Sequence, residues 1–341
     1  MNTDNEWREP DQHAQIAGYL KSWRVEPRRV DCQSENKTAD HTLRLPPVAL
    51  VPGTGQPVDT PEETAMRTEL ISIPTETVPL DGALHWPDGA VTGAVLLFHG
   101  NTMNFYVGAP RSLPPALTRM GYACLAFNRR GHDILSIRNS RAAEGAAFQL
   151  TRESIEDNRT AARWMAARGF PPPVIIGHSN GGMLAVPHVV THPDTPAMVL
   201  LSAHGGGKDG VLRTSRAGLM AADRLEEITA QAKQLVAAGR GKELLLMPGW
   251  WYVISAESFL DRNTEMPDTL ELAPQIRCPV LYLRGDQENA ETYPAEAFQA
   301  RSGGPCEVQI IPNCDHFYNG QEPAVIDRVT AWLAKTLPKG G

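Results

Sequence analysis

Long hydrophobic runs are missing from this chain. Its apolar runs, such as Ala94–Phe98, Val174–Ile176 and Met198–Leu201, span a few residues each. A membrane-spanning helix needs ~20 apolar residues, so none of these runs is long enough to cross a bilayer. Residues 1–10 are polar and carry acidic groups, and they lack the basic start and apolar stretch of a secretory signal. These features predict a soluble, cytoplasmic protein.

An excess of basic charge is also missing. The chain has 32 Lys and Arg against 39 Asp and Glu, which gives a formal net charge of −7. A nucleic-acid binder needs a basic face that neutralises phosphates, and adsorption to an acidic membrane needs the same. Both kinds of partner are therefore excluded.

Cysteines are few and scattered: Cys32, Cys124, Cys278, Cys306 and Cys314. An odd number at irregular spacings does not form a disulfide framework, and no pair has the spacing of zinc ligands. A chain of 341 residues can bury a large core and needs neither disulfides nor a structural metal for stability. We therefore expect a reduced protein without a metal site.

Residues 1–66 have few apolar clusters and several prolines. Within them, Gln12–Trp23 has the spacing of a short amphipathic helix. This N-terminal extension either wraps the main domain, covers the active site or contacts a second subunit, and the sequence does not choose among these roles. A homodimer would use this extension or the cap described below.

From residue 67 onward, short apolar runs alternate with helical stretches. The predicted strands are Glu69–Ile73, Val78–His85, Ala94–Phe98, Ala123–Phe127, Val174–Ile176, Met198–Leu201, Pro279–Leu283 and Glu307–Ile311. The predicted helices are Pro110–Met120, Glu153–Arg168, Gly182–Thr191 and Pro323–Leu337. Alternating strands and helices predict an α/β fold with a mostly parallel, doubly wound sheet.

One connection is too long for this fold class. About 75 residues separate the strand that ends near Ser202 from the strand that begins near Pro279. They include the strongly helical stretch Leu219–Ala238 and an aromatic cluster of Trp250, Trp251 and Tyr252. We interpret residues 205–275 as a helical cap inserted into a core made of residues 67–204 and 276–341.

The pentapeptide from Gly177 to Gly181 reads G-x-S-x-G, with Ser179 at its centre. It follows a predicted strand and precedes a predicted helix, which is the context of a nucleophile elbow. The turn projects the serine above the sheet, and the helix N-terminus favours developing negative charge. Ser179 is therefore the predicted nucleophile.

A serine hydroxyl needs a general base, and the base needs a carboxylate that orients it. His316 is the best-placed base because it follows the last predicted strand, and His132 and His204 rank second. Two acids, Asp286 and Glu288, follow the strand Pro279–Leu283. We favour Glu288, with Asp286 as the second choice.

The reaction also needs N–H donors for the oxyanion. The turn His99-Gly100 follows a predicted strand and presents the backbone N–H of Asn101, or that of Thr102. The backbone N–H of Asn180 supplies the other donor.

With these residues in order, the chain resembles the α/β-hydrolase fold superfamily from about residue 67 to 337. The matching elements are His99-Gly100, the loop Asn128-Arg129-Arg130-Gly131-His132, the elbow at Ser179, the acid at Glu288, and His316. Nucleophile, acid and histidine follow one another in the order of that superfamily. Two positions depart from its usual pattern, because Asn128 and Glu288 stand where Asp is common.

The resemblance implies a serine hydrolase that acts through an acyl-enzyme on an ester or lactone of a medium-sized, partly hydrophobic small molecule. The sequence shows no metal cluster or nucleotide-binding loop, so we expect no cofactor. The predicted substrate pocket is lined by Phe105, Tyr106, Met183, Trp250, Trp251 and Tyr252.

Four alternatives remain open at this point. A C–C bond hydrolase, an acyltransferase or an amidase could use the same triad. In the C–C bond hydrolase, Arg129 or Arg130 could bind a substrate carboxylate. A non-catalytic small-molecule receptor could retain the fold.

Overall fold

The computed structural model describes residues 66–137, 144–249 and 252–337. All of them belong to one compact unit, Glu62–Gly341. The predicted N-terminal extension lies outside the described residues except for Met66, and so does its predicted helix Gln12–Trp23.

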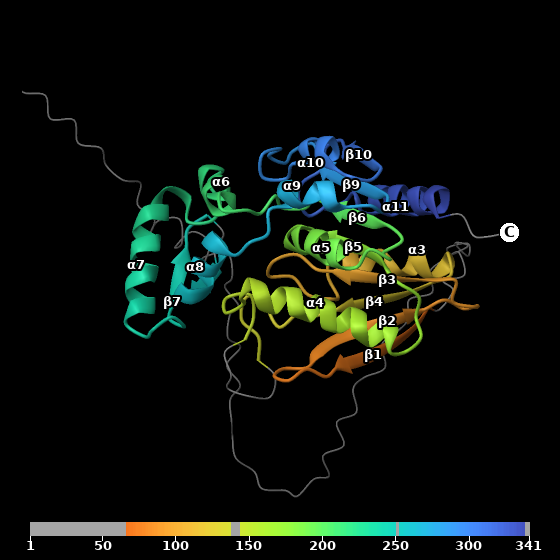
Figure 1. Ribbon diagram of the computed structural model, residues 1–341, viewed down its shortest axis with the longest axis horizontal. Helices are drawn as coiled ribbons and strands as arrows, with labels where there is room; N and C mark the ends of the chain where they lie inside the picture. The colour runs from red at the N-terminus through yellow and green to blue at the C-terminus, as the bar shows by residue number, and fades with distance from the viewer. Residues whose placement is uncertain (1–65, 138–143, 250–251, 338–341) are drawn as a thin grey trace, which may run out of the picture. The chain divides into compact units, whose positions relative to one another are not determined.

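The core is one sheet of eight strands in the order β1-β2-β4-β3-β5-β6-β9-β10 (Figure 1). The strands are β1 Arg67–Ile73, β2 Leu80–Trp86, β3 Gly93–Phe98, β4 Tyr122–Phe127, β5 Val174–His178, β6 Met198–Leu201, β9 Val280–Gly285 and β10 Cys306–Ile311. Only β2 runs against the others in this sheet, because it pairs antiparallel with both β1 and β4. The predicted mostly parallel sheet is confirmed.

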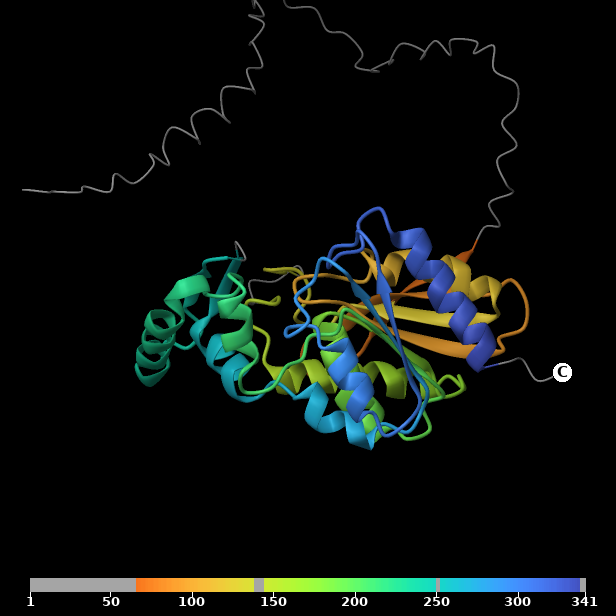
Figure 2. The same cartoon turned by 90° about the horizontal axis from the view of Figure 1, so that it is seen from above.

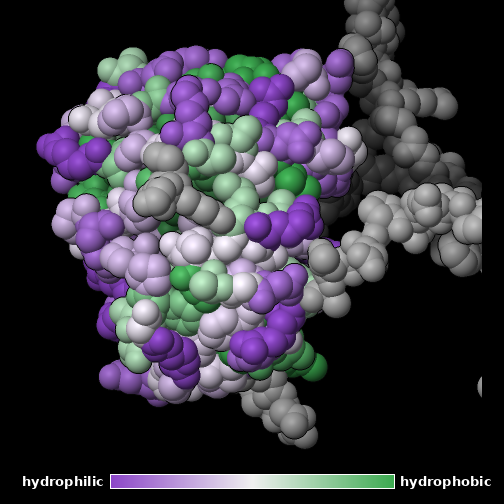
Figure 3. Space-filling view, turned by 90° about the vertical axis from the view of Figure 1, so that its right-hand side faces the viewer, coloured by the Kyte–Doolittle hydropathy of each residue, from purple (hydrophilic) through white to green (hydrophobic). Residues whose placement is uncertain are grey.

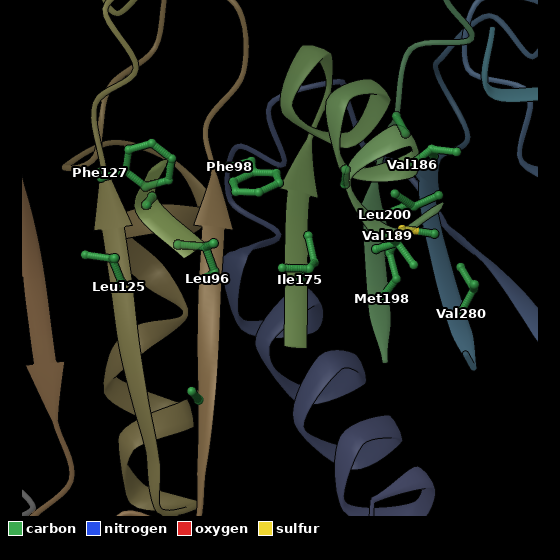
Figure 4. Packing of buried hydrophobic residues seen from close by; sticks show 14 of the residues in the cluster. Leu96, Phe98, Leu125, Phe127, Ile175, Val186, Val189, Met198, Leu200 and Val280 are labelled. Carbon is green, nitrogen blue, oxygen red and sulfur yellow. The ribbon is translucent and has the colours of Figure 1, made fainter. Parts of the chain in front are cut away.

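Helices cover both faces of this sheet. They are α2 Ala109–Ser112, α3 Pro114–Arg119, α4 Thr151–Ala166, α5 Asn180–Thr191, α10 Ala295–Arg301 and α11 Glu322–Thr336. One buried cluster joins side chains of α4, α5 and α10 to one face of the sheet, and a second joins those of α3 and α11 to the other. Figure 4 shows Val186 and Val189 of α5 beside Leu200 and Met198 of β6. Because both faces are covered, the central strands are continuous apolar runs.

The predicted helix Pro110–Met120 is in fact two helices, α2 and α3, separated at Leu113. Pro114 and Pro115 cause the break, because proline lacks the N–H that would continue the helical ladder. Helical spacing alone does not reveal this interruption.

Residues 205–275 join β6 to β9, and we refer to them as the inserted segment. Its elements are α6 Gly210–Arg216, η1 Ala222–Arg224, α7 Leu225–Ala237, β7 Leu244–Met247, β8 Tyr252–Ser255, α8 Ala256–Thr264, α9 Thr269–Leu272 and η2 Ala273–Gln275. The antiparallel pair β7–β8 makes the inserted segment less purely helical than the sequence indicates. A hydrophobic cluster of its own, which includes Met247 and Phe259, holds α6, α7, α8 and the pair together.

The part of the inserted segment from α6 to α8 lies at one end of the sheet (Figures 1 and 2). Its last elements, α9 and η2, pack on the core beside α5 and α10. Hydrogen bonds attach α8 and the preceding Ser255 to the core. The Ser255 N–H donates to the Ala147 carbonyl at 2.7 Å, and the Asp261 carboxylate accepts from the Thr151 N–H at 2.7 Å. Arg262 Nη2 donates to Asn101 Oδ1 at 2.9 Å. The same helix therefore reaches both α4 and the loop after β3.

On the face of the molecule seen in Figure 3, hydrophilic residues are interspersed with hydrophobic ones. In the described ranges, no helix has the length and apolar character that crossing a membrane requires.

Candidate active site

Ser179 lies between β5 and α5 with backbone angles φ 55° and ψ −117°. A positive φ is costly for a residue with a side chain, so the surrounding packing must hold this turn. Two glycines permit that packing. A Cβ at Gly177 would lie 2.5 Å from the Gly181 carbonyl oxygen, and one at Gly181 would lie 2.2 Å from the Phe98 carbonyl oxygen. The sequence motif therefore folds into a tight strand-turn-helix that presents the serine.

His316 bridges Ser179 and Glu288. Its Nε2 is 2.9 Å from Ser179 Oγ, and its Nδ1 is 2.6 Å from Glu288 Oε1. The imidazole also stacks at a tilt against the ring of Tyr293, with the ring centroids 4.5 Å apart. The fold thus brings Ser179 together with two side chains that lie more than a hundred residues later in the sequence, with the imidazole in the middle.

Glu288 is in contact with His316, whereas Asp286 is not. The Glu288 side chain is 2% exposed. The Asp286 carboxylate instead accepts from the backbone N–H groups of Asn313 and Cys314 at 3.0 and 3.1 Å. These two hydrogen bonds lower the pKa of Asp286. Asp286 therefore stabilises the loop that carries His316 through hydrogen bonds, and Glu288 orients the imidazole.

Two residues around Glu288 were not predicted from the sequence. Ser202 Oγ donates to Glu288 Oε2 at 2.5 Å, and the Tyr318 hydroxyl lies 2.6 Å from Ser202 Oγ. Tyr318 OH also donates to the Leu283 carbonyl at 3.1 Å. The available signal was position: Ser202 directly follows β6, and Tyr318 is two residues after His316.

The predicted oxyanion residues lie beside Ser179. Asn101 and Asn180 line the same cavity as the serine, as does Thr102. Asn180 is the first residue of α5, so its N–H has no acceptor within the helix. The turn that precedes Asn101 packs closely on the elbow, because a Cβ at Gly100 would lie 3.4 Å from Ser179 Cβ.

The other histidines have other partners. Burial lowers the pKa of His204 to about 3, and the nearby Arg213 adds to that effect. His178 Nε2 is 2.9 Å from the His316 carbonyl, and burial lowers its pKa to about 3 as well. His132 Nδ1 is 2.7 Å from Asp133 Oδ2. Of the three candidate bases, only His316 contacts the nucleophile in the described structure.

Arg129 and Arg130 both hold the loop after β4. Arg129 is fully buried and its Nη2 donates to the His99 carbonyl at 2.6 Å. Arg130 forms an ion pair with the buried Asp157 at 2.6 Å. Neither lines the cavity beside Ser179. The structure thus gives both arginines the loop-anchoring role.

A cavity of about 560 Å³ opens at Ser179 between the core and the inserted segment. Polar residues of the core form its floor, and apolar residues of the inserted segment form much of its wall. The apolar part includes Val211, Leu219, Met220 and Met266. Arg262 lies in the same lining.

Three of the predicted substrate-binding residues, Phe105, Tyr106 and Met183, do not line this cavity. Phe105 packs against the core, and Tyr106 is 53% exposed. Met183 is buried under the turn at Gly206. Trp250 and Trp251 lie outside the described residues, and Tyr252 begins β8. Among the described residues, no cluster of His, Cys, Asp or Glu could hold a metal ion.

Comparison with known proteins places this geometry in a family. The family model described as "Alpha/beta hydrolase family" matches residues 95–329. Est1E from Butyrivibrio proteoclasticus, in a structure with ferulic acid bound, superimposes with a TM-score of 0.62 at 17% identity, over 79% of this chain and 100% of that one. The alpha/beta hydrolase GrgF from a Penicillium species gives 0.61 at 14% identity, over 80% and 99%.

A dienelactone hydrolase from Anabaena variabilis gives a TM-score of 0.50 at 17% identity, over 79% of this chain and 98% of that one. At these identities the likeness shows the fold alone. No curated protein matches the sequence. The family model covers well over half of the chain, and the sheet order and elbow agree with it, so this protein belongs to the alpha/beta hydrolase family.

Proposed function

We propose that this protein is a serine hydrolase that cleaves a carboxylic ester or lactone through an acyl-enzyme. The single observation that carries the proposal is the relay from Ser179 Oγ through His316 to Glu288, with distances of 2.9 and 2.6 Å. A serine within hydrogen-bond reach of a base, itself oriented by a carboxylate, is the arrangement that nucleophilic catalysis requires.

In the proposed reaction, Ser179 Oγ attacks the ester carbonyl while His316 Nε2 takes the hydroxyl proton. The carbonyl oxygen becomes an oxyanion, which the backbone N–H groups of Asn101 and Asn180 stabilise. Collapse of this intermediate breaks the ester bond, and His316 returns its proton to the leaving alkoxide. Water then attacks the acyl-enzyme while His316 takes its proton. The bond between the acyl group and Ser179 Oγ breaks, His316 returns the proton to Ser179 Oγ, and the acid is released.

The cavity supports a small-molecule substrate. Its volume of about 560 Å³ falls within the range of sites for drug-sized ligands, roughly 300–1,000 Å³. Its mixture of an apolar wall and a few polar groups near Ser179 suits a partly hydrophobic acyl group.

The test is hydrolysis of p-nitrophenyl esters of graded acyl length, measured for the wild type and Ser179→Ala. We expect turnover in the wild type and a loss of roughly 10⁴- to 10⁶-fold in kcat in the variant, because triad members act as a unit. A fluorophosphonate probe should label the wild type and leave the variant unlabelled.

Labelling without turnover on any ester or lactone would keep the nucleophile and overturn the substrate class, in favour of an amide or C–C bond. Absence of both labelling and turnover would overturn the proposed reaction. Equal rates in the two proteins would show that another residue acts.

A further inference from the structure

We propose that Arg262 binds a carboxylate of the substrate, so that the enzyme selects esters or lactones that carry a free acid group close to the scissile carbonyl. This inference rests on the proposed function and specifies its substrate class. The carboxylate site is a second element of the same cavity, supplied by α8 of the inserted segment.

The first step is the position of Arg262. Its side chain lines the cavity that opens at Ser179, although the residue is only 8% exposed. Its Nη2 donates to Asn101 Oδ1 at 2.9 Å and to the Ala146 carbonyl at 3.4 Å. Asn101 belongs to the turn that we assign to the oxyanion, so the guanidinium lies close to the site of acyl transfer.

The second step is charge. Both acceptors of Arg262 are neutral, and no carboxylate in the described part of the chain forms an ion pair with it. A cation removed from water is costly unless an anion accompanies it. Arg262 therefore leaves a positive charge inside the cavity, and a ligand can neutralise it.

The third step is that the nearby acids already have partners. Glu288 accepts from His316, Ser202 and the Gly285 N–H. Asp315, also in the lining, accepts from Asn319 Nδ2 and from backbone N–H groups of its own loop. Asp261, the chain neighbour of Arg262, accepts from Thr151.

The fourth step compares the other arginines. Arg129 is fully buried beneath the oxyanion turn, and Arg130 pairs with Asp157. Arg213 of α6 donates to the Gly206 carbonyl and does not line the cavity. Among the described arginines, Arg262 is therefore the one that lines the cavity, and its planar guanidinium fits a carboxylate with two parallel hydrogen bonds.

The chemistry of the occupant follows from the surroundings. The carboxylate would bind at Arg262, the scissile carbonyl would lie at Ser179, and the rest of the molecule would contact the apolar wall around Met220 and Met266. Monoesters of short dicarboxylic acids and lactones with a carboxylate substituent have this combination.

The experiment compares two chromogenic substrates of similar length, mono-p-nitrophenyl glutarate and p-nitrophenyl hexanoate. For the wild type we expect a higher kcat/KM on the glutarate. In Arg262→Gln, the ratio of the two kcat/KM values should fall roughly 10- to 100-fold, as expected for losing hydrogen bonds to a charged group. Arg262→Lys should retain part of the ratio, because it keeps the charge without the planar geometry.

Arg213→Gln is the matched control, because it removes an arginine of the inserted segment that lies outside the cavity lining. It should keep the wild-type ratio. An unchanged ratio in Arg262→Gln, with both rates lowered equally, would overturn the proposal and leave Arg262 as a tether between α8 and the oxyanion turn. A wild type without preference for the glutarate would overturn it as well.

A binding measurement separates this inference from the proposed function. If the wild type hydrolyses neither ester, titration calorimetry with glutarate still tests the site. Binding that weakens at least tenfold in Arg262→Gln and Arg262→Lys, with a wild-type affinity in Arg213→Gln, supports the carboxylate site although the esterase proposal has failed. Absence of glutarate binding to the wild type overturns the site. Thermal melting of each variant checks that it is folded.

Discussion

The Glu288 carboxylate is held from several sides. Oε1 faces His316, and Oε2 accepts from the Gly285 N–H at 2.7 Å and from Ser202 Oγ at 2.5 Å. Tyr318 extends this chain of hydrogen bonds, because its hydroxyl lies 2.6 Å from Ser202 Oγ. Ser202 and Tyr318 thus fix the orientation of the glutamate without lining the cavity, which makes them positioning residues.

Ser202→Ala tests this role. It removes one hydrogen bond to a charged group, so we expect kcat on a p-nitrophenyl ester to fall roughly tenfold with KM little changed. Tyr318→Phe should have a smaller effect, because Tyr318 acts through Ser202. The double variant should then be no worse than Ser202→Ala alone. Additive losses, or a change confined to KM, would contradict the positioning role.

A second pair of substitutions decides between the two acids. Glu288→Gln keeps the size of the side chain and removes the charge that stabilises an imidazolium, so we expect kcat to fall roughly 10³- to 10⁴-fold. Asp286→Asn still offers one acceptor to the loop at Asn313 and Cys314, and we expect a loss below about tenfold. The measurement is kcat of both variants on the same ester. A larger loss of kcat in Asp286→Asn than in Glu288→Gln would make Asp286 the acid that orients His316.

At the scale of elements, the sequence predicted the strands and turns whose own residues form a recognisable pattern. The buried strands β3 to β6 are continuous apolar runs because helices cover both faces of the sheet. The turn at Ser179 needs glycines at Gly177 and Gly181, so it is visible as a motif. The order of motifs along the chain then indicates which loops meet at one end of the sheet.

Features decided by tertiary packing were not predictable in this way. Leu244–Met247 is an unbroken apolar run in sequence, yet its residues alternate between exposed and buried in β7, and only the partner β8 reveals this. Aromatic character suggested that Phe105 and Tyr106 face the substrate, whereas Phe105 packs against the core and Tyr106 is exposed to solvent. Arg262 carries no motif and reaches the site only because α8 is docked there.

That docking has an energetic consequence for α4. Its N-cap residue is Leu150, which has no side-chain acceptor for the first turn. Asp261 supplies one from α8, since its Oδ2 accepts from the Thr151 N–H and Oγ1 at 2.7 and 2.6 Å. A helix N-terminus thus receives its cap, and its compensating negative charge, from the inserted segment.

We predict that Asp261→Ala lowers the free energy of unfolding by about 1 kcal/mol, the usual value of an N-cap. Asp261→Asn should lose less, because the amide oxygen still accepts. Urea denaturation of both variants measures the difference. Asp194→Ala, at an exposed acid between α5 and β6, is the control and should unfold like the wild type. Equal stability of Asp261→Ala and the wild type would contradict the capping role.

For the molecule as a whole, several histidines are buried in the neutral form. Burial lowers the pKa of His178, His188 and His204 to about 3. It also lowers that of His99 well below its ordinary value. In the unfolded chain a histidine has a pKa of about 6.5. Between these two pKa values the unfolded state binds more protons than the folded state. The contribution of these histidines to the free energy of unfolding is therefore fully present above pH 6.5 and is lost as the pH falls.

His188 provides the cleanest test, because it lies in α5 away from Ser179 and packs against Phe98. Each such histidine lowers the free energy of unfolding by about 1.4 kcal/mol for each pH unit below 6.5. When the pH is lowered from 7.5 to 5.5, the free energy of unfolding should therefore fall in both proteins, and the fall should be smaller in His188→Gln than in the wild type by roughly 1 kcal/mol. Val189→Ala, a buried neighbour that does not titrate, should shift the free energy equally at both pH values. Urea denaturation at the two pH values makes the comparison. A His188→Gln protein with the wild-type pH dependence would mean that His188 accepts a proton in the folded state.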